Sequence, residues 1–573
     1  MPKRLAIVIA GAVSLGSYEA GVLYEVLEAL RQHNTNPEST DDEKIWIDVL
    51  TGASAGGMTT TIAAQKLLFD ADALSGESTN AFYLPWVLDI SLDGLLDLRP
   101  DDNSTHSILS SDLVRTIAEK HLLARYQGPK IPSAKRHPAA ADKIWLGLAL
   151  SNLNGVDFQR PLQTHQLHFT YTRYQDEYTA QFDAGNRAHD TLEAWRFPCA
   201  GARSTGAFPF AFSLVPLTRT REEFIEMDPA NADFLVKWPS ATATFAYTDG
   251  GTFQNEPLGL AKDLVDKIDE HYNTDSRFYL FVSPGERTGT ADSRFTALDP
   301  RIPKVVGHLV GAIFHQARFH DWIRAEEMND HIRILDDRAI GLKTLIINGK
   351  IEPERDLEPA AKALLPILLE TRKSKNAESL GEARQRLISQ YQKEFNEIVA
   401  QKPGSSNPQS NAMIWIDSIL TLETAAYLGA RDEMVIYGIT ATEKELASSL
   451  LCAFGGFFDR RFREHDYILG RNKARQFLRD LNNPKMSFRR QKGWSSLGPI
   501  RCKIPGDLPI DHSLDGQTLE NLDPALLGRF ENRCVDRIDE LLAQVKVNGV
   551  IRWVLRTFYL KAKIKEFLSK PPS

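Results

Sequence analysis

Two short apolar segments near the N-terminus constrain the fold more than any other feature of this sequence. Leu5–Ala10 is a continuous apolar run that ends at Gly11. Ile45–Leu50 is a second, mainly apolar segment, with Ile45, Ile47, Val49 and Leu50, and it ends shortly before another glycine. Short apolar runs bounded by glycine are typical of buried strands. After each run, apolar residues recur at helical spacing, from Tyr18 and from Gly57. The order strand, helix, strand, helix predicts an α/β fold with a parallel sheet covered by helices.

The turn after the second expected strand carries a candidate nucleophile. Residues 52–56 read Gly-Ala-Ser-Ala-Gly and fit the pattern G-x-S-x-G, with Gly52 and Gly56 on either side of Ser54. In a nucleophile elbow the serine lies on a strained strand-to-helix turn, which exposes its hydroxyl. The following helix directs its N-terminal N–H groups toward developing negative charge. The alternative is an ordinary glycine turn between a strand and a helix.

A serine hydroxyl needs a neighbouring base, and no histidine of this chain stands in a matching motif. The sequence Tyr-Thr-Asp-Gly-Gly at 247–251 offers a carboxylate instead, because Gly250 and Gly251 leave the space around Asp249 open. The alternative is a simple Asp-Gly turn. In an α/β-hydrolase several strands precede the serine, whereas Ser54 follows only two. An esterase with a Ser-His-Asp triad therefore remains the second choice.

The loop after the first expected strand is a candidate oxyanion hole. It reads Gly-Ala-Val-Ser-Leu-Gly at 11–16, and the backbone N–H groups of Gly11, Ala12 and Val13 are the candidate donors. The loop lacks both G-x-x-x-x-G-K-[ST] and G-x-G-x-x-G, which argues against nucleotide binding. A plain strand-to-helix turn is the alternative.

Taken together, these motifs resemble those of the patatin-like phospholipases. The resemblance covers roughly residues 4–285: the glycine loop, G-x-S-x-G about 40 residues later and D-G-G late in the domain. The segment Ala202–Phe210 is similar to the family's A-S-x-A-x-P-x-x-F segment, and Asn255 and Pro257 match its N-x-P. The resemblance implies a three-layer α/β/α fold and hydrolysis of fatty acyl esters by a Ser-Asp dyad. It makes Ser54 the nucleophile and Asp249 the base.

The glycine loop departs from the family pattern, which usually reads G-G-G-x-[RK]-G. Ala12 and Val13 replace two glycines, and Leu15 stands where the family has a basic residue. Side chains at these positions restrict φ, so we expect an oxyanion hole of different shape.

At 573 residues the chain is too long for one compact core, and we predict four parts. They are a patatin-like catalytic domain over 1–290, a helical segment over 291–401, a linker over 402–411 and a mainly helical extension over 412–573. The linker KPGSSNPQSN is predicted from its composition. Within the first part we interpret Asp70–Arg136 as a cap near the site. Further strands are expected at Ile144–Leu150, Leu167–Tyr171, Tyr178–Phe182 and Phe278–Val282, and in the extension at Met434–Ile439.

The extension itself resembles one found on some bacterial patatin-related proteins, through residues Phe454–Leu478. Its charged cluster, Arg463, Glu464, His465, Asp466 and Arg471, we interpret as a buried ion-pair network or a solvated face rather than as a second site. Near the C-terminus, Lys546–Lys570 has seven basic residues and one acidic residue, a net charge of +6. Its apolar residues recur at helical spacing, which predicts either a docking helix or peripheral membrane contact.

Composition narrows the remaining classes of function. The formal net charge of -7 argues against a general nucleic-acid-binding protein. None of the four cysteines pairs with another at C-x-x-C spacing, and H-E-x-x-H and EF-hand patterns are absent, so no metal or other cofactor is expected. No stretch reaches the ~20 apolar residues that span a bilayer. We expect a cytoplasmic protein that can attach peripherally to membranes.

The function that we predict is a serine lipid acyl hydrolase, similar to a phospholipase A, acting through an acyl-enzyme on phospholipid or another acyl-ester lipid. A lipid acyltransferase using the same dyad and a non-catalytic lipid-binding scaffold are the alternatives.

Overall fold

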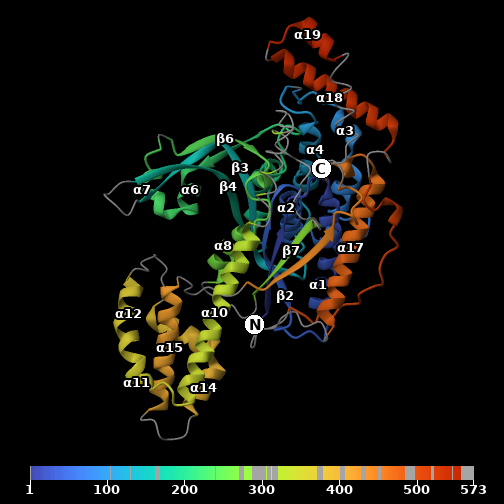
Figure 1. Ribbon diagram of the computed structural model, residues 1–573. Helices are drawn as coiled ribbons and strands as arrows, with labels where there is room; N and C mark the ends of the chain where they lie inside the picture. Colours follow the sequence, from blue (N-terminus) through green and yellow to red (C-terminus); the bar gives the residue numbers. More distant parts are fainter. Residues whose placement is uncertain are drawn as a thin grey trace. The chain divides into compact units, whose positions relative to one another are not determined.

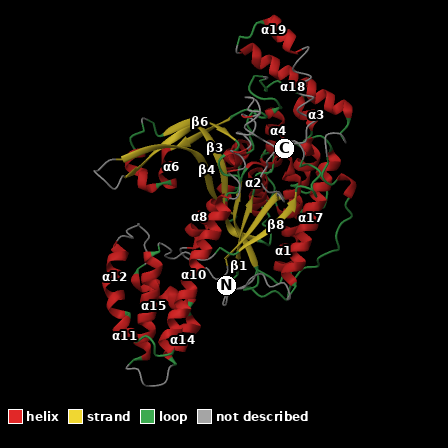
Figure 2. Cartoon of the chain, viewed as in Figure 1, coloured by secondary structure: helices red, strands yellow, loops and turns green. Residues whose placement is uncertain are grey.

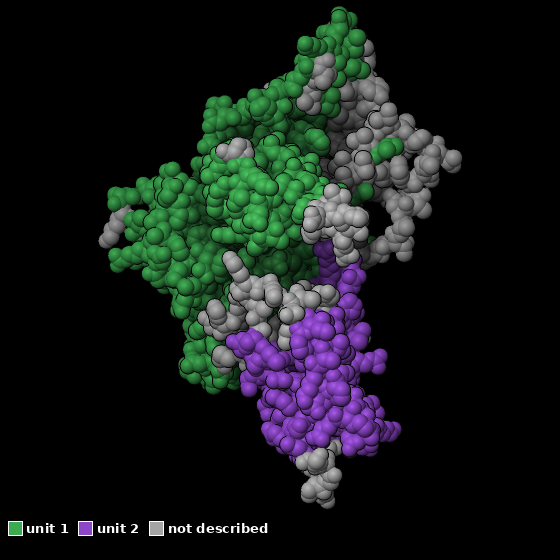
Figure 3. Space-filling model, turned by 90° about the vertical axis from the view of Figure 1, so that its left-hand side faces the viewer, with its two compact units in different colours: residues 1–321, 435–573 green, residues 322–434 purple. Residues whose placement is uncertain are grey.

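The computed structural model of the chain divides into two compact units, 1–321 with 435–573, and 322–434 (Figure 3). The structure describes residues 2–556, with the exception of 104, 130, 162–167, 239, 270–276, 287–304, 306–311, 313–315, 317–319, 371–378, 401–406, 427–433, 450–452, 484–496, 518–521 and 545.

The first unit is built on a mixed sheet with the strand order β5-β6-β3-β2-β1-β7-β8 and with β4 paired to β3 (Figure 2). The pairs β1–β2, β1–β7, β2–β3 and β7–β8 are parallel, whereas β3–β4, β3–β6 and β5–β6 are antiparallel. The strands are β1 (Lys3–Ile9), β2 (Ile45–Gly52), β3 (Ala140–Pro161), β4 (His168–Asp183), β5 (Val215–Thr220), β6 (Thr242–Thr248), β7 (Arg277–Glu286) and β8 (Ile436–Thr442).

Helices cover both faces of this sheet (Figure 1). A Cβ atom on Gly147 of β3 would lie 3.0 Å from Leu260 and Leu264 of α8 (Leu258–Asp269), whereas the next residue, Leu148, lies beside Gly201 of α5 (Leu192–Thr205). Successive residues of a strand point to opposite faces, so α8 and α5 lie on opposite sides. This arrangement confirms the predicted three-layer α/β/α fold.

Three more helices pack on α5, either directly or through one another. They are α1 (Gly16–Thr35), α2 (Ser54–Phe69) and α17 (Arg460–Asn482). Helix α2 packs on α5 and α1, and α17 packs along α1 (Figure 1). The predicted elements Leu5–Ala10 and Ile45–Leu50 correspond to β1 and β2, with a helix after each. Their apolar side chains form the core, because β1 and β2 are buried between the two helical layers.

The other described helices belong to one of the two units. In the first unit they are α3 (Leu92–Leu96), α4 (Ser111–Leu122), α6 (Arg221–Met227), α7 (Ala232–Leu235), α18 (Pro524–Gln544) and α19 (Gly549–Val554). The second unit has its own core, in which Trp415 and Ile419 are completely buried. Its helices are α11 (Pro353–Asp356), α12 (Glu358–Glu370), α13 (Leu380–Gln390), α14 (Gln392–Val399) and α15 (Pro408–Ala425), together with α10 (His320–Ile347), which begins in the first unit.

The division along the chain differs from the four consecutive parts that the sequence predicted. Residues 435–573 return to the first unit, because β8 adds to the sheet beside β7, with Ile436 opposite Tyr279. The predicted linker 402–411 is partly helical: Asn407 caps α15, and its side chain accepts the N–H of Ser410. Residues 402–406 lie outside the described part of the chain.

The prediction of two strands between residues 167 and 182 also differs from the structure. Leu167–Tyr171 and Tyr178–Phe182 were expected as two strands, but residues 168–183 form one strand because β4 pairs with β3 along its length. Of the basic segment Lys546–Lys570, the structure describes residues 546–556, apart from the side chain of Val554. There Arg552 and Arg556 pair with Asp539 and Asp536 of α18. No helix in the described part of the chain is long and apolar enough to cross a bilayer.

Candidate active site

Ser54 lies at the turn from β2 into α2, as the G-x-S-x-G pattern predicted. Its φ is 50°, a left-handed conformation that side chains rarely adopt and that is typical of a nucleophile elbow. A Cβ atom on Gly56 would lie 2.4 Å from the carbonyl oxygen of Ile9, and one on Gly52 would lie 2.4 Å from that of Gly56. Both glycines are therefore required by close backbone approach.

Asp249 lies directly beside this serine, although 195 residues separate them in the sequence. The Ser54 hydroxyl donates to Oδ2 of Asp249 at 2.7 Å. Asp249 follows β6, is only 1% exposed, and its Oδ1 accepts the N–H of Gly251 at 2.7 Å. Burial raises the pKa of Asp249 to about 7, against the opposing effect of these two hydrogen bonds. The carboxyl group can therefore take up and release a proton near neutral pH.

Two hydroxyl side chains that the sequence did not single out hold this pair in place. Thr205 accepts the N–H of Ser54 at 2.8 Å and donates to the carbonyl of Ala149 at 2.7 Å. Ser151 donates to the carbonyl of Asp249 at 2.7 Å. Thr205 lies within Ala202–Phe210, the segment that is similar to a family segment, but its role was not indicated by the sequence.

The glycine loop lies next to Ser54, but one of its three expected donors is engaged. A Cβ atom on Gly11 would lie 3.0 Å from the Cβ of Ser54, so the loop borders the site. The N–H of Gly11 donates to the carbonyl of Asn255 at 2.9 Å, which removes Gly11 from the expected oxyanion donors. Ala12 and Val13 stand at the start of a short 3-10 helix, where N–H groups lack intrahelical acceptors. They remain the candidate donors.

Val13 has the backbone conformation of a glycine although it carries a β-branched side chain. Its φ is 52°, and a left-handed conformation costs roughly 1–2 kcal/mol for a residue with a Cβ atom. Val13 therefore holds a backbone conformation that glycine would adopt without this cost. Strain of this kind persists only where surrounding structure holds it.

The family model of patatin-like phospholipases matches residues 7–262. Residues 7–262 are a patatin-like phospholipase domain. The domain contains Ser54, Asp249 and the glycine loop, and its family supports a lipid acyl hydrolase activity in general terms. No curated protein matches the chain.

A mainly apolar pocket opens onto Ser54 in the patatin-like domain. Residues of the predicted cap, among them Trp86, Val114 and Ile117, line this pocket, and so does Phe457 from the C-terminal part of the chain. The lining residues are Val13, Ser54, Ala55, Met58, Ile62, Pro85, Trp86, Ile90, Val114, Ile117, Ala118, His121, Leu122, Ala202, Arg203, Gly206, Phe208, Phe212 and Phe457. The pocket suits an acyl chain, because its wall is largely hydrocarbon.

Two basic side chains interrupt this apolar wall. His121 lies with Nε2 2.6 Å from Oδ2 of Asp89, and burial lowers the pKa of this histidine. Arg203 is partly buried, and burial lowers its pKa too. In the described part of the chain no carboxylate forms an ion pair with Arg203, whereas His121 is partnered.

No histidine among the described residues contacts Ser54 or Asp249, and the serine hydroxyl is bonded directly to the carboxylate. The patatin-like domain therefore departs from the geometry of a Ser-His-Asp triad. Within the same described residues, no group of three His, Cys, Asp or Glu side chains is arranged to hold a metal ion.

Proposed function

We propose that the patatin-like domain is a serine lipid acyl hydrolase, similar to a phospholipase A, that uses a Ser54–Asp249 dyad. The observation that carries this proposal is the 2.7 Å hydrogen bond from the Ser54 hydroxyl to the buried carboxylate of Asp249. A base whose pKa is about 7 suits proton transfer at neutral pH, because it is both ionised in part and basic enough to accept a proton.

The first half of the reaction acylates Ser54. Asp249 accepts the hydroxyl proton while Oγ attacks the ester carbonyl, and the negative charge forms on the carbonyl oxygen next to the N–H groups of Ala12 and Val13. The ester C–O bond then breaks, and the alcohol leaves with the proton that Asp249 returns to it.

Hydrolysis of the acyl-enzyme repeats these steps with water. Asp249 takes a proton from the attacking water, the tetrahedral intermediate collapses, and the fatty acid leaves as Ser54 regains a proton. An alcohol in place of water would give acyl transfer, so the two activities differ only in the second nucleophile.

The pocket supports a lipid substrate that carries a negative charge. Its hydrocarbon wall fits the acyl chain, and Arg203, which forms no ion pair with a described carboxylate, is among the lining residues. A cation held in a low-dielectric pocket attracts an anion more strongly than one in water does. We propose that Arg203 favours phospholipids over uncharged esters.

Hydrolysis of phosphatidylcholine and phosphatidylglycerol vesicles by wild-type and Ser54→Ala protein tests the proposed function. We expect free fatty acid from the wild type and none above background from the variant, with unchanged circular dichroism. Fatty acid release by Ser54→Ala would place the nucleophile elsewhere. Acyl product that appears only when an alcohol acceptor is added would identify an acyltransferase, and no product in either case would favour a scaffold.

A further inference from the structure

The C-terminal part of the chain contacts the candidate oxyanion loop directly. Ser14, which follows Val13, is completely buried. Its hydroxyl donates to the carbonyl of Ala453 and accepts the N–H of Gly456 at 3.0 Å. Both partners lie about 440 residues away in the sequence and outside the matched domain of 7–262. The loop is therefore held by a part of the chain that the family model does not include.

Helix α17 in turn holds the segment Ala453–Phe457. The buried guanidinium of Arg463 donates to the carbonyl of Gly456 at 2.6 Å. One turn later, the carboxylate of Asp466 accepts the N–H of Ala447 at 2.8 Å, on the chain leading to this segment. Two side chains of one helix thus anchor the chain on either side of Ala453.

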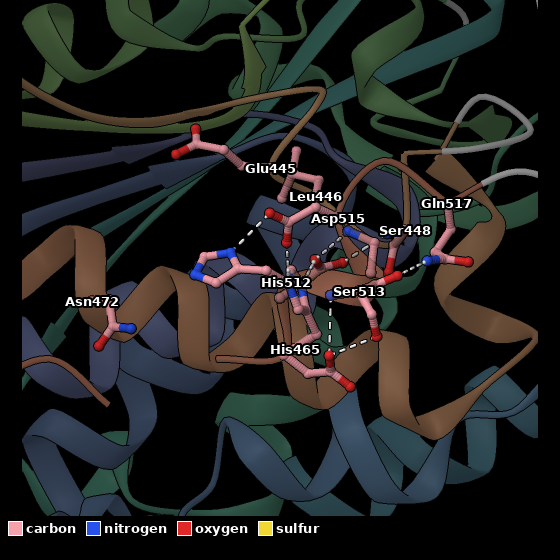
Figure 4. Close-up of polar contacts among 12 residues, drawn as sticks. Glu445, Leu446, Ser448, His465, Asn472, His512, Ser513, Asp515 and Gln517 are labelled. Atoms are coloured by element: carbon pink, nitrogen blue, oxygen red, sulfur yellow. Dashed lines mark hydrogen bonds and ion pairs between the residues drawn. The ribbon is translucent and has the colours of Figure 1, made fainter. Parts of the chain in front are cut away.

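Asp466 contacts His465, and His465 lies in a polar cluster with Asp515 (Figure 4). His465 lies between two carboxylates, with Nδ1 3.1 Å from Asp466 and Nε2 2.9 Å from Asp515. Burial lowers the pKa of His465, but the hydrogen bonds and charges of the two aspartates outweigh it and leave the pKa above its usual value. Of the charged cluster that the sequence singled out, Arg463, His465, Asp466 and Arg471 are buried, whereas Glu464 is partly exposed.

Helix α17 has a fixed position on α1, the helix that follows the oxyanion loop. A Cβ atom on Gly21 would lie 2.0 Å from the carbonyl oxygen of Tyr467, and one on Gly470 would lie 2.2 Å from that of Tyr18. Glu25 of α1 also pairs with Arg471 at 2.9 Å and Arg475 at 2.8 Å. Loop, α1, α17 and the segment Ala453–Phe457 thus form a closed ring of contacts.

We infer that Ser14 is a positioning residue of the oxyanion hole, and that the segment Ala453–Phe457 completes this hole from the C-terminal part of the chain. The inference rests on the proposed function. The two hydrogen bonds of Ser14 hold the strained conformation at the adjacent Val13, and so direct the N–H groups of Ala12 and Val13 toward the carbonyl of the substrate. Phe457 of the same segment lines the pocket, so one element shapes both the oxyanion hole and the acyl-chain site.

The substitution Ser14→Ala tests this inference, with Ser448→Ala as the matched control. Ser448 is also completely buried, and its hydroxyl has no hydrogen-bond partner among the described residues. Each change removes one buried hydroxyl, but only Ser14 lies in the oxyanion loop. We expect Ser14→Ala to lower kcat about 10- to 100-fold with KM changed less than threefold, because a displaced oxyanion donor acts mainly on the transition state. We expect Ser448→Ala to retain wild-type kcat.

Inhibitor binding separates positioning from a general loss of structure. A trifluoromethyl ketone lipid analogue forms an oxyanion on Ser54, whereas the matching ether analogue cannot. We expect Ser14→Ala to lower the affinity for the ketone by the same factor as it lowers kcat. The affinity for the ether should not change. Equal effects on both analogues, or wild-type kcat in Ser14→Ala, would overturn the inference.

A second variant reaches the same contact from the other side. A Cβ atom on Gly456 would lie 2.7 Å from the Ser14 hydroxyl and 2.6 Å from that of Ser448. In a Ser448→Gly background, which also removes the Ser448 Cβ atom 3.0 Å away, Gly456→Ala should therefore lower kcat chiefly through Ser14, and should add little once Ser14→Ala is also present. Full additivity would overturn the inference. Wild-type protein that neither hydrolyses lipid nor reacts with the ketone would overturn the proposed function, and the inference with it.

Discussion

The substitution Asp249→Asn should abolish hydrolysis and at the same time stabilise the fold. Burial disfavours the charged form of this carboxylate and raises its pKa from 3.8 to about 7. An amide of the same size cannot take the proton of Ser54 at neutral pH. It carries no charge to desolvate, and its oxygen can still accept the N–H of Gly251. Catalysis and stability therefore respond in opposite directions at this position.

The magnitude follows from the shift of the pKa. A difference of about three units corresponds to roughly 4 kcal/mol, since each unit is about 1.4 kcal/mol. Because the folded-state pKa lies above the unfolded-state value, stability that is present below pH ~4 is lost as the pH rises and is fully lost above pH ~7. Asp249→Asn removes this loss. Its advantage over the wild type should grow by about 2–3 kcal/mol between pH 5 and pH 8.

Urea denaturation of both proteins across this pH range measures the difference in the free energy of unfolding. Ser54→Ala serves as a control, because it alters the same hydrogen bond and leaves the carboxylate in place. Two results would refute the argument that burial of a charge sets the pKa of Asp249. One is an Asp249→Asn protein that is less stable than the wild type at pH 8, and the other is a difference in the free energy of unfolding that does not change with pH.

Three further predictions concern the pocket and the C-terminal segment. His121→Gln should retain kcat within about fivefold, because the dyad has its own base; a loss as severe as that of Ser54→Ala would indicate a triad. Arg203→Gln should raise KM about 3- to 10-fold for anionic phospholipid and leave p-nitrophenyl ester hydrolysis unchanged, since one charge-assisted contact is lost; equal effects on both substrates would contradict its role. In α19, Val550 and Trp553 are 71% and 60% exposed. The full chain should therefore sediment with anionic vesicles at low salt more than a folded chain ending at Ala543 does, and equal binding would exclude this segment.

Local patterns predicted the first half of the fold and the two residues of the proposed dyad, which the structure joins by a hydrogen bond. The apolar runs before Gly11 and Gly52 were recognisable because a buried parallel strand is continuously apolar and must end where a helix begins. Ser54 and Asp249 were recognisable because a strained elbow and a crowded turn each demand glycine beside them. At Gly250 this demand is severe, since a Cβ atom there would lie 1.9 Å from the carbonyl oxygen of Ala149.

Contacts between distant parts of the chain could not be predicted in this way. The pairing of β8 with β7 joins residues separated by the entire second unit, and no periodicity within β8 specifies its neighbour. For the same reason the hydrogen bond from Gly11 to Asn255 was missed, although both residues had been noted separately. The partners of Ser14 were likewise not indicated, because its small polar side chain suits any turn.

The most direct test of the Ser54–Asp249 dyad is reaction with a fluorophosphonate, followed by peptide mapping of the adduct across pH. We predict a single adduct on Ser54 in the wild type, formed at a rate that rises with pH and has a midpoint near 7, because Asp249 must be ionised to accept the proton. We also predict labelling at least 100-fold slower in Asp249→Asn. An adduct on another residue, or wild-type labelling rates in Asp249→Asn, would contradict the dyad.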